Sequence, residues 1–239
     1  MTIRQLTSVA ILIGALTLGA CSKDDEDDKV NDNDLHEYVD LGLPSGTLWA
    51  TCNVGANKPE EYGLYFAWGE TTGYRSDTTD GHQFNWTTYK WCKGAENKMT
   101  KYCVKGNYGT VDNKIDLEDD DDAATINWSD VWHMPTIEQV SELLNSEYTT
   151  ITKTKHNGVN GRKIVSKKNG NYIFLPAAGY RYDSKFGNGD SGGYYWYRSL
   201  SSSGSDKALI LIFGTGVPDC YSLYRYYGAS VRPVRPPKK

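Results

Sequence analysis

The sequence predicts an α+β fold: irregular, twisted antiparallel sheets with one or two helices and long ordered loops. One segment alone carries a complete helix signal, and most other patterned segments are short apolar runs between turn residues, which is typical of strands. A chain of 239 residues, 38% hydrophobic and 13% aromatic, is long enough to bury one sizeable core. No internal repeat is visible in the sequence, which excludes solenoids and propellers.

The helix signal begins with Pro135 and Thr136. Thr136 can accept a hydrogen bond at the N-cap while Gln139 reaches back to the free amide, and Pro135 prevents an earlier start. Four apolar positions then recur at helical spacing: Ile137, Val140, Leu143 and Leu144. This apolar stripe needs a partner, and because most of the chain is strand-like, we expect the partner to be a sheet.

Strand patterns lie on both sides of the helix. Residues 37–56 contain two extended runs around a turn at residues 43–46, and residues 162–166 and 171–175 flank an Asn-Gly hairpin turn. Three later runs have strand character: residues 193–200, 207–213 and 222–234. Residues 71–115 are polar and Gly-rich but contain many aromatic side chains, which predicts a large ordered loop and not a disordered linker.

The N-terminus has the character of a signal peptide over residues 1–20. Arg4 supplies positive charge, and residues 9–18 form an apolar run too short for a transmembrane helix. Leu18-Gly19-Ala20-Cys21 resembles a bacterial lipobox, which implies cleavage before Cys21 and acylation of that cysteine. Several acyl chains on one residue give stable membrane anchoring. Ordinary secretion, with Cys21 in a disulfide, is the alternative.

An acidic, flexible tether is predicted at residues 21–35. These residues are mostly charged or amide-bearing and lack aromatic side chains, so they cannot bury enough surface to fold. Residues 22–28 resemble the acidic export signal of surface lipoproteins of Bacteroidota, although a solvated tether has the same composition. We therefore expect a protein lipid-anchored in the outer membrane and facing the extracellular side, with one domain at residues 36–235 and a tail at 236–239.

Composition and spacing argue against several partners and cofactors. A net charge of −4 and a pI near 5.6 argue against nucleic acid, whose binding depends on a basic surface. Zinc-ligand spacing is absent, and the acidic run at residues 116–127 is not an EF-hand, because Asp121 and Asn127 stand where Gly and Glu are required. No cofactor is predicted. An irregular Ca2+ site in this run is the alternative to a solvated acidic loop.

Four cysteines remain in the expected domain: Cys52, Cys92, Cys103 and Cys220. An even number in an exported chain permits two disulfides, with three connectivities that the sequence does not distinguish. Cys92 and Cys103 close a short loop and form the first pair that we expect.

Residues 189–193 read Gly-Asp-Ser-Gly-Gly, as in the nucleophile turn of chymotrypsin-like proteases. A serine hydroxyl needs a neighbouring imidazole as base, and no histidine of this chain has the sequence context of a protease base. We therefore predict a Gly-rich turn around Ser191 and no catalytic residue.

Four separated parts of the chain resemble one family. They are residues 38–50 with 62–70, residues 121–136, residues 174–180, and residues 193–196 with 230–234. They resemble the Fibrobacter succinogenes major paralogous domain, which occurs in secreted and surface proteins of Bacteroidota. The resemblance implies a C-type-lectin-like fold, similar also to formylglycine-generating enzymes. In that fold the first and last strands pair, so residues 39–49 should lie beside residues 230–234.

The chain departs from the patterns of these relatives at three points. His133 stands where the family is expected to carry an arginine of a buried ion pair. The Glu-Pro-Asn, Gln-Pro-Asp and Trp-Asn-Asp motifs of calcium-dependent sugar binding are absent, and Cys220 stands alone where formylglycine-generating enzymes carry a copper-binding cysteine pair. The resemblance therefore transfers the fold and a role in surface recognition, and we expect a binding protein and not an enzyme.

The ligand-binding surface is predicted in the last third of the chain, which is rich in tyrosine. Tyrosine offers large, stiff, amphipathic contact area at small entropic cost. Residues 208–231 also lack Lys, Glu, Gln, Met, Trp and Asn, which resembles the variable segment of lectin-fold proteins diversified by retroelements. The predicted ligand face comprises Tyr197, Arg198, Pro218, Asp219, Tyr221, Leu223, Tyr224 and Tyr226.

The expected ligand of this face is an extracellular glycan or protein. Two alternatives remain open at the level of the sequence. One is an enzyme of the formylglycine-generating type, which requires bound metal and a reactive cysteine pair. The other is a structural component of the cell envelope or of adhesion, which requires a fixed protein partner.

Overall fold

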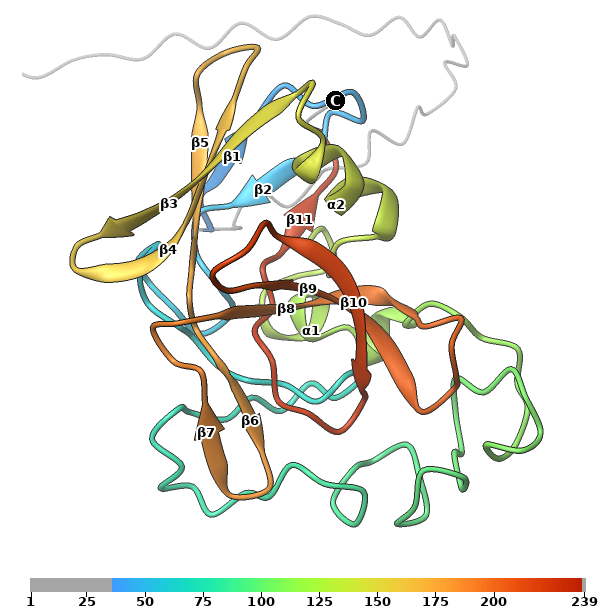
Figure 1. The fold of residues 1–239 in the computed structure, drawn as a ribbon. Coiled ribbons are helices and arrows are strands. Elements are labelled where there is room, and N and C mark those ends of the chain that lie inside the picture. The colour runs from blue at the N-terminus through green and yellow to red at the C-terminus, as the bar shows by residue number, and fades with distance from the viewer. Residues whose placement is uncertain (1–35, 238–239) are drawn as a thin grey trace, which may run out of the picture. The chain divides into compact units, whose positions relative to one another are not determined.

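The computed structural model describes residues 36–237, which belong to one compact unit. The predicted signal peptide, the lipidation site Cys21 and the acidic tether lie outside the described residues. Mostly antiparallel sheets and two short α-helices build the described part, which agrees with the predicted α+β class (Figure 1). Within residues 36–237, no helix has the length and apolar character that crossing a membrane requires.

The two ends of this domain pair in one sheet. Its strands are β1 (Tyr38–Asp40), β2 (Leu48–Ala50) and β11 (Val234–Arg235). β2 lies between the other two, and Trp49 stands opposite Val39 on one side and Val234 on the other. The last strand therefore pairs with β2 and not with the first strand β1, and the expected proximity of residues 39–49 to residues 230–234 is confirmed at Trp49 and Val234; Figure 1 shows β11 beside β2.

The predicted helix is α2 (Ile137–Leu144), which follows a short helix α1 (Ala123–Asn127) and a 3₁₀ turn η1 (Asp119–Asp121). Its predicted capping box is present. The Thr136 hydroxyl accepts from the Gln139 N–H at 3.4 Å, and Gln139 Oε1 accepts from the Thr136 N–H at 2.9 Å. Ile137, however, is 39% exposed. The contact with the core is made by later positions: Val140, Leu143 and Leu144.

A second sheet contains β3 (Thr149–His156), β4 (Val159–Ser166) and β5 (Tyr172–Pro176). β4 and β5 form the predicted hairpin, with Ile164 opposite Ile173. β3 pairs with β4 but was not predicted, because Ile151 is its one strongly apolar residue and most of its other side chains remain exposed or half-exposed at the sheet edge. Lys and Thr at such an edge are typical of a strand that avoids pairing with other chains.

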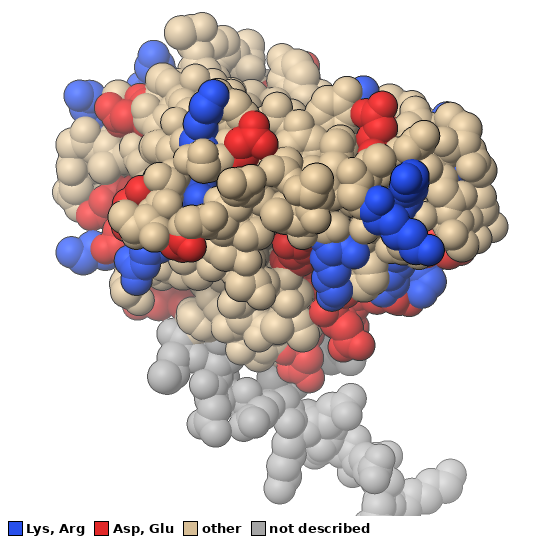
Figure 2. All heavy atoms as spheres, turned by 90° about the horizontal axis from the view of Figure 1, so that it is seen from below, with Lys and Arg blue, Asp and Glu red and all other residues tan. Residues whose placement is uncertain are grey.

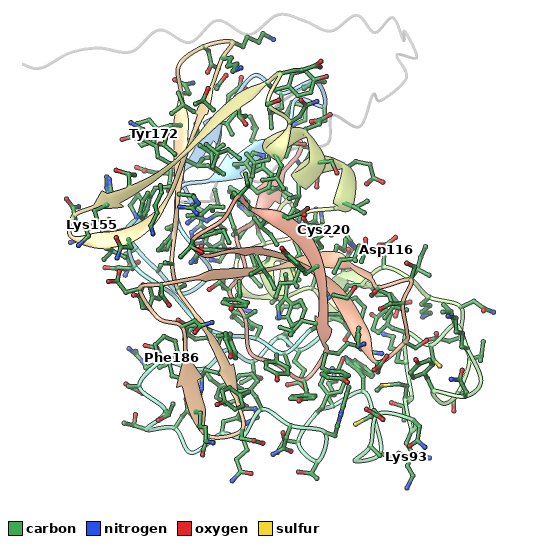
Figure 3. All side chains as sticks on the ribbon, viewed as in Figure 1. Lys93, Asp116, Lys155, Tyr172, Phe186 and Cys220 are labelled. Carbon is green, nitrogen blue, oxygen red and sulfur yellow. The ribbon has the colours of Figure 1, made fainter. Side chains whose placement is uncertain are left out.

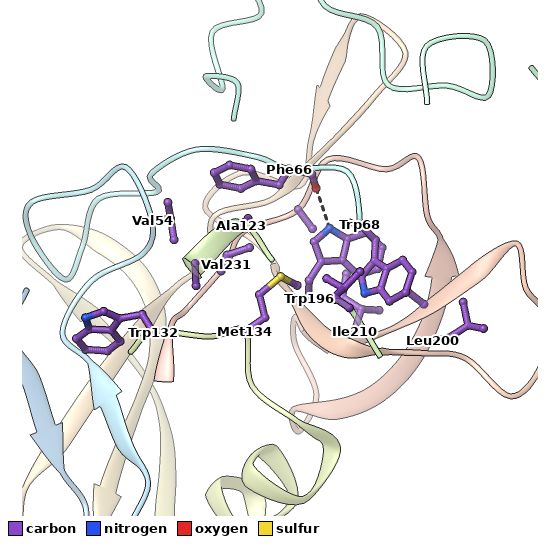
Figure 4. Packing of buried hydrophobic residues seen from close by; sticks show 14 of the residues in the cluster. Val54, Phe66, Trp68, Ala123, Trp132, Met134, Trp196, Leu200, Ile210 and Val231 are labelled. Carbon is purple, nitrogen blue, oxygen red and sulfur yellow. Dashed lines mark hydrogen bonds between the residues drawn. The ribbon is translucent and has the colours of Figure 1, made fainter. Parts of the chain in front are cut away.

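The central sheet has the order β10-β9-β8 and contains β8 (Gly193–Leu200), β9 (Lys207–Phe213) and β10 (Asp219–Tyr224). Its two faces pack into different core clusters. On β9, Ile210 belongs to the first cluster, around Trp68 and Trp196 (Figure 4), whereas Leu211 belongs to the second cluster, which includes Trp49. Burial on both faces explains the continuous apolar run of this strand. It also accounts for the missing charged residues there without genetic diversification.

The predicted strand at residues 222–234 is wrong in extent. The chain leaves β10 after Tyr224, and the Arg225 N–H donates to the Asp206 carbonyl at 3.1 Å. Residues 228–230 then make only isolated bridges before β11 begins. Gly228 passes so close to Phe84 that a Cβ there would lie 2.6 Å from the ring. The apolar pattern of this segment reports burial and not a continuous strand.

Residues 51–118 contain isolated bridges but no helix and no extended strand. They contact the hairpin of β6 (Tyr180–Tyr182) and β7 (Lys185–Gly187), where the Phe84 N–H donates to the Asp183 carbonyl at 3.0 Å. Such a segment lacks ladder partners for many backbone groups, and buried groups of this kind need other hydrogen bonds. Three buried arginines from the last third of the chain supply them.

Arg232 connects the N-terminal sheet with the second sheet. Its guanidinium donates to the carbonyls of Ala50 at 3.0 Å, Thr51 at 2.8 Å and Phe174 at 3.0 Å, and to Asn53 Oδ1 at 2.9 Å. The side chain is 1% exposed, and burial lowers the pKa of Arg232. A buried guanidinium without a carboxylate partner is tolerated because its rigid donors are taken up by fixed oxygen atoms.

The other two arginines, Arg181 and Arg225, are fully buried and serve the irregular segment in the same way. Arg225 donates to the carbonyls of Lys101, Tyr102 and Ser205 and to the Tyr89 hydroxyl. Arg181 donates to the carbonyls of Arg75 and His82, and two of its nitrogen atoms donate to the Asp80 carboxylate. These bonds attach residues 75–102 to the C-terminal part of the domain.

We expect Arg232→Met to lower the free energy of unfolding by about 3 kcal/mol, because four buried acceptors lose their donor while only part of the desolvation cost of the charge is recovered. Urea unfolding at neutral pH measures this change. The matched control is Arg75→Met, because Arg75 is exposed and contributes its carbonyl rather than its guanidinium to the Arg181 network. Equal stability of the two variants would contradict the role given to Arg232.

Candidate functional site

Most residues of the predicted ligand face lie on β10 or within two residues of it, and β10 is an edge strand of the central sheet. Asp219 is exposed there, and Tyr221 is 50% exposed. The remaining members of this part of the face are half-buried: Pro218, Leu223, Tyr224 and Tyr226. Leu223 packs against the first core cluster. The structure thus places several of the predicted residues together on and just after β10.

Tyr197 is wrongly predicted as a ligand-binding residue. It is 2% exposed and belongs to the second core cluster, because alternate residues of β8 point into that cluster. Burial raises the pKa of its hydroxyl, which lies in hydrogen-bonding contact with the Cys220 thiol. Tyr197 is a core residue of the domain.

Arg198 does not contact the predicted tyrosines. Its Nε and Nη2 atoms donate to the Leu117 carbonyl at 3.0 and 2.8 Å, and Nη2 also donates to Asp119 Oδ1 at 2.7 Å. The β8 position of Arg198 therefore directs it toward the acidic segment before α1. The predicted face is wrong in joining Arg198 to the tyrosines of β10.

Half-buried aromatic rings form a continuous surface, here called the tyrosine stripe. It consists of Tyr194, Tyr180, Tyr182, Tyr227, Tyr226 and Tyr224, with Trp86 beside the last two. Ring centroids of successive members are 4.7 Å apart for Tyr194 and Tyr180, 5.7 Å for Tyr180 and Tyr227, and 4.7 Å for Tyr227 and Tyr226. Such offset and tilted contacts are the favourable arrangements of aromatic pairs.

Two identical tripeptides, Tyr-Arg-Tyr, supply four of the six tyrosines. They are residues 180–182 on β6 and residues 224–226 at the end of β10. In each, the central arginine is 0% exposed and binds backbone carbonyls, while the flanking tyrosines are half-buried. The Arg181 N–H and carbonyl pair with those of Gly228 at 2.7 and 2.9 Å, which brings the two tripeptides together. The inward arginines therefore fix the outward tyrosines.

The stripe is uncharged, with cations at its margins. The Nζ atoms of Lys185 and Lys207 lie 5.5 Å from the Tyr182 ring and 5.1 Å from the Tyr224 ring. Burial raises the pKa of Tyr180 and Tyr226, so their hydroxyls keep their protons at neutral pH. Figure 2 shows the end of the molecule where the β6–β7 hairpin lies, and charges of both signs are interspersed there with uncharged surface.

Four members of the stripe were outside the predicted ligand face, and Trp86 makes a fifth. Tyr180, Tyr182, Tyr194 and Tyr227 belong to the tyrosine-rich last third of the chain, so the composition contained a signal for them. Trp86 comes from the irregular segment, and no local pattern connects it with β10. The repeated Tyr-Arg-Tyr tripeptide is the signal that identifies the stripe in the sequence.

Two carboxylates of the acidic run accept hydrogen bonds from other groups of the protein. Asp121 is 3% exposed and accepts from Lys101 Nζ at 2.5 Å and from the Tyr102 hydroxyl at 2.6 Å. Asp122 is 0% exposed, and its carboxylate accepts N–H bonds that begin α1 and fix Met134. In residues 36–237, no group of three or more His, Cys, Asp or Glu side chains is arranged to hold a metal ion.

The cysteines of the described residues are free, so the expected Cys92–Cys103 disulfide is not formed. The Cys92 thiol donates to the Trp86 carbonyl at 3.0 Å, and the Cys103 thiol donates to the Lys105 carbonyl at 3.3 Å. Burial raises the pKa of Cys52, Cys92 and Cys220, which makes these thiols poor nucleophiles. Cys220 on β10 also lies far from the loop of Cys92, whose neighbour Lys93 is labelled in Figure 3.

Residues 189–191 form the predicted Gly-rich turn between β7 and β8. The Ser191 hydroxyl donates to the Asn188 carbonyl at 2.9 Å, and no histidine of the described residues contacts it. Asp190 accepts from the Asn160 N–H at 2.9 Å and thereby ties the turn to β4. The turn is a structural connection.

Comparisons with protein-family models, with curated proteins and with solved structures return no match to this chain. Fold and site therefore define its class: an α+β domain with an open aromatic surface built on buried arginines.

Tyr197→Ala should lower the free energy of unfolding by about 3 to 5 kcal/mol, because it leaves a cavity in the second core cluster. Tyr221→Ala should change the free energy by no more than about 0.5 kcal/mol, because half of that side chain is in water. Urea unfolding of both variants tests the reassignment of Tyr197. Similar losses of unfolding free energy in the two variants would contradict the assignment of Tyr197 to the core.

Proposed function

We propose that this chain is a lipoprotein anchored in the outer membrane, and that it binds an extracellular glycan or protein through the tyrosine stripe of a lectin-like domain. The observation that carries the proposal is the ring-to-ring continuity of six half-buried tyrosines and Trp86 on one surface. Large contiguous aromatic surfaces that remain in contact with water are typical of recognition sites.

Three features support the lectin-like fold. Both ends of the domain share one sheet, in which the last strand pairs with β2, and a long irregular segment lies between β2 and α1. The helix start at Met134-Pro135-Thr136 also lies beside the last strand, because the backbone groups of His133 and Val234 donate to each other at 2.9 Å. The shared sheet and the helix start come from parts of the sequence that resemble the Fibrobacter succinogenes major paralogous domain.

The stripe combines apolar ring faces with hydroxyl groups. Sugar rings present C–H faces that stack on aromatic rings, and their hydroxyls pair with tyrosine hydroxyls; protein ligands use the same two properties. The rings are already packed against one another, so binding orders few side chains and costs little conformational entropy. Such a surface suits a ligand with extended, weakly charged faces.

Changing Tyr226 and Tyr227 together to Ala should weaken ligand binding by about 2 kcal/mol, roughly 30-fold in Kd, because the change interrupts the stripe at its centre. A screen of the chain against arrays of glycans and extracellular proteins identifies the ligand, and titration of both forms measures the loss. Tyr172→Ala is the matched control, because Tyr172 is 43% exposed on β5 and lies outside the stripe.

Unchanged binding by the double variant, with its fold intact by circular dichroism, would place the ligand elsewhere. The same preparations distinguish the alternatives. An enzyme of the formylglycine-generating type predicts bound metal and a reactive cysteine pair, which metal analysis and thiol titration detect. A structural envelope component predicts one stable protein partner and no response on the arrays.

The N-terminal part of the proposal concerns Cys21. Mass spectrometry should find the mature chain beginning at an acylated Cys21, and Cys21→Ser should move the protein from the membrane fraction to the soluble fraction, because the acyl chains provide the anchor. External protease should degrade the wild-type protein on intact cells. An unmodified Cys21 thiol, or one in a disulfide, would favour ordinary secretion instead.

A further inference from the structure

β10 leaves one side of the central sheet without a strand partner. It pairs with β9 along one side, and within residues 36–237 no strand or isolated bridge pairs with its other side. Asp219, Tyr221 and Ser222 are exposed there. Unlike β3, this edge strand contains no lysine, and its register with β9 runs without a shift. It therefore lacks the features that normally keep an edge from pairing with another chain.

The hydrogen bonds of Lys207 show which backbone groups of β10 face outward. Lys207 stands opposite Tyr224 in the register of β9 and β10. Its N–H, however, donates to the Gly204 carbonyl at 3.1 Å, and its carbonyl accepts from the Ser201 N–H at 3.0 Å. The pair of Lys207 and Tyr224 therefore contributes no bond between the two strands.

The following pair has the opposite character, because the Arg225 N–H donates to the Asp206 carbonyl at 3.1 Å. Bonded and non-bonded pairs alternate along an antiparallel ladder. Every second residue back from Tyr224 is therefore also non-bonded to β9, which includes Ser222 and Cys220. The backbone N–H and carbonyl groups of these three residues point to the open edge.

Two of these outward groups are already satisfied within the chain. The Cys220 N–H donates to Asp219 Oδ1 at 2.7 Å, and the Tyr224 carbonyl accepts from the Tyr227 N–H at 3.1 Å. The groups that remain for a partner strand are the Cys220 carbonyl, the N–H and carbonyl of Ser222, and the Tyr224 N–H.

The remaining groups match those of a second copy. In an antiparallel pair with a two-fold axis at Ser222, each Ser222 N–H meets the Ser222 carbonyl of the other copy, and each Tyr224 N–H meets the other Cys220 carbonyl. The one bond that this register omits joins the Cys220 N–H to the Tyr224 carbonyl, and both of those groups are already satisfied. A register moved by two residues in either direction places a satisfied group opposite a free one.

The side chains agree with this register. Tyr221, which is 50% exposed in the single chain, faces Leu223 of the second copy at a non-bonded position, where cross-strand side chains are closest. Asp219 is the only charged residue of β10, and the two Asp219 carboxylates lie at opposite ends of the paired strands. No like charges of the two strands face each other.

We propose that two copies of this chain pair through their β10 edges about a two-fold axis at Ser222, which joins their central sheets into one. The contact is small, so the dimer is weak and depends on concentration. Pairing uses the backbone of Tyr224, while its ring stays in the tyrosine stripe, 5.8 Å from that of Tyr226. The inference does not rest on the proposed function.

Sedimentation equilibrium tests the dimer with the chain in solution, where Cys21→Ser removes the acylation site. Ser222→Pro deletes the outward N–H, and proline is tolerated on an edge strand at such a position. We expect this variant to raise the Kd of the dimer about tenfold or more, because the bond is lost in both copies. Ser222→Ala is the matched control, because it removes the same hydroxyl and keeps the N–H, so it should dimerise as the wild type does.

Ser222→Cys tests the register, in a chain where Cys220→Ser removes the neighbouring thiol. A residue on the two-fold axis faces itself, and the Cα atoms of a hydrogen-bonded pair lie about 5.5 Å apart, within the range that a disulfide spans. Oxidised glutathione should therefore convert most of this variant to a disulfide-linked dimer on a non-reducing gel. Ser184→Cys in the same background should remain monomeric, because Ser184 is exposed at the tip of the β6–β7 hairpin, away from β10 (Figure 1).

Native Cys220 provides a second control on the register. It faces Tyr224 of the second copy, so the two Cys220 residues are about 13 Å apart along the strands. The wild type should therefore not form a disulfide through Cys220, and such a disulfide would overturn the proposed register.

Three further results would each overturn the proposal: a wild type that stays monomeric at the highest concentrations reached, equal dimerisation of Ser222→Pro and Ser222→Ala, or equal cross-linking of Ser222→Cys and Ser184→Cys. The cross-linking test does not depend on the folding of Ser222→Pro, which circular dichroism checks. Neither Tyr226 nor Tyr227 lies on β10, so the double variant of the stripe should dimerise as the wild type does. Failure of one proposal therefore leaves the other intact.

Discussion

The structure depends on how buried arginines satisfy the backbone of a long irregular segment. Residues 51–118 have no extended strand or helix, so their buried carbonyls lack ladder partners. Arg181, Arg225 and Arg232 enter the interior from the last third of the chain and donate to carbonyls of that segment between residues 51 and 102. Without these donors, folding would leave several polar groups unpaired, each costing about 1 to 3 kcal/mol.

The same arginines organise the surface. On β6 the backbone is extended and neighbouring side chains point to opposite sides, so the buried Arg181 places Tyr180 and Tyr182 outward. Arg225 lies in the turn that follows β10 and is buried there between two half-buried tyrosines. Arg181 and Arg225 each lie between two tyrosines, and Gly228 brings the two tripeptides into register by pairing with Arg181. The interior hydrogen bonds and the exterior aromatic surface are thus two consequences of one repeated tripeptide. A change to either arginine should alter stability and the stripe together.

Features set by residues close together in the sequence could be predicted, whereas features set by contacts between distant residues could not. Thr136 and Gln139 lie within one turn of each other, so the capping box of α2 could be identified directly. The pairing of β2 with β11 came from the family resemblance, since no local pattern connects residues so far apart. The burial of Arg225 could not be predicted, because arginine is mostly exposed and its carbonyl partners are distant in sequence. For the same reason the run 222–234 was mistaken for one strand, and Tyr197 for a surface residue.

Stability and recognition draw on the same side chains in this domain. Tyr194 and Tyr227 pack against the first core cluster, and Tyr226 packs against a third cluster that includes Phe84 and Met99. Each ring therefore keeps one face in the protein and leaves part of its surface to water. A platform held in this way has few rotamers to lose on binding, which favours affinity for a ligand of matching shape. It also limits which positions can vary, because a stripe tyrosine replaced by a smaller residue removes packing as well as contact area. Tyr221 and Asp219 on the β10 edge are exposed and contribute little packing, so substitutions there should change the stability of the domain little.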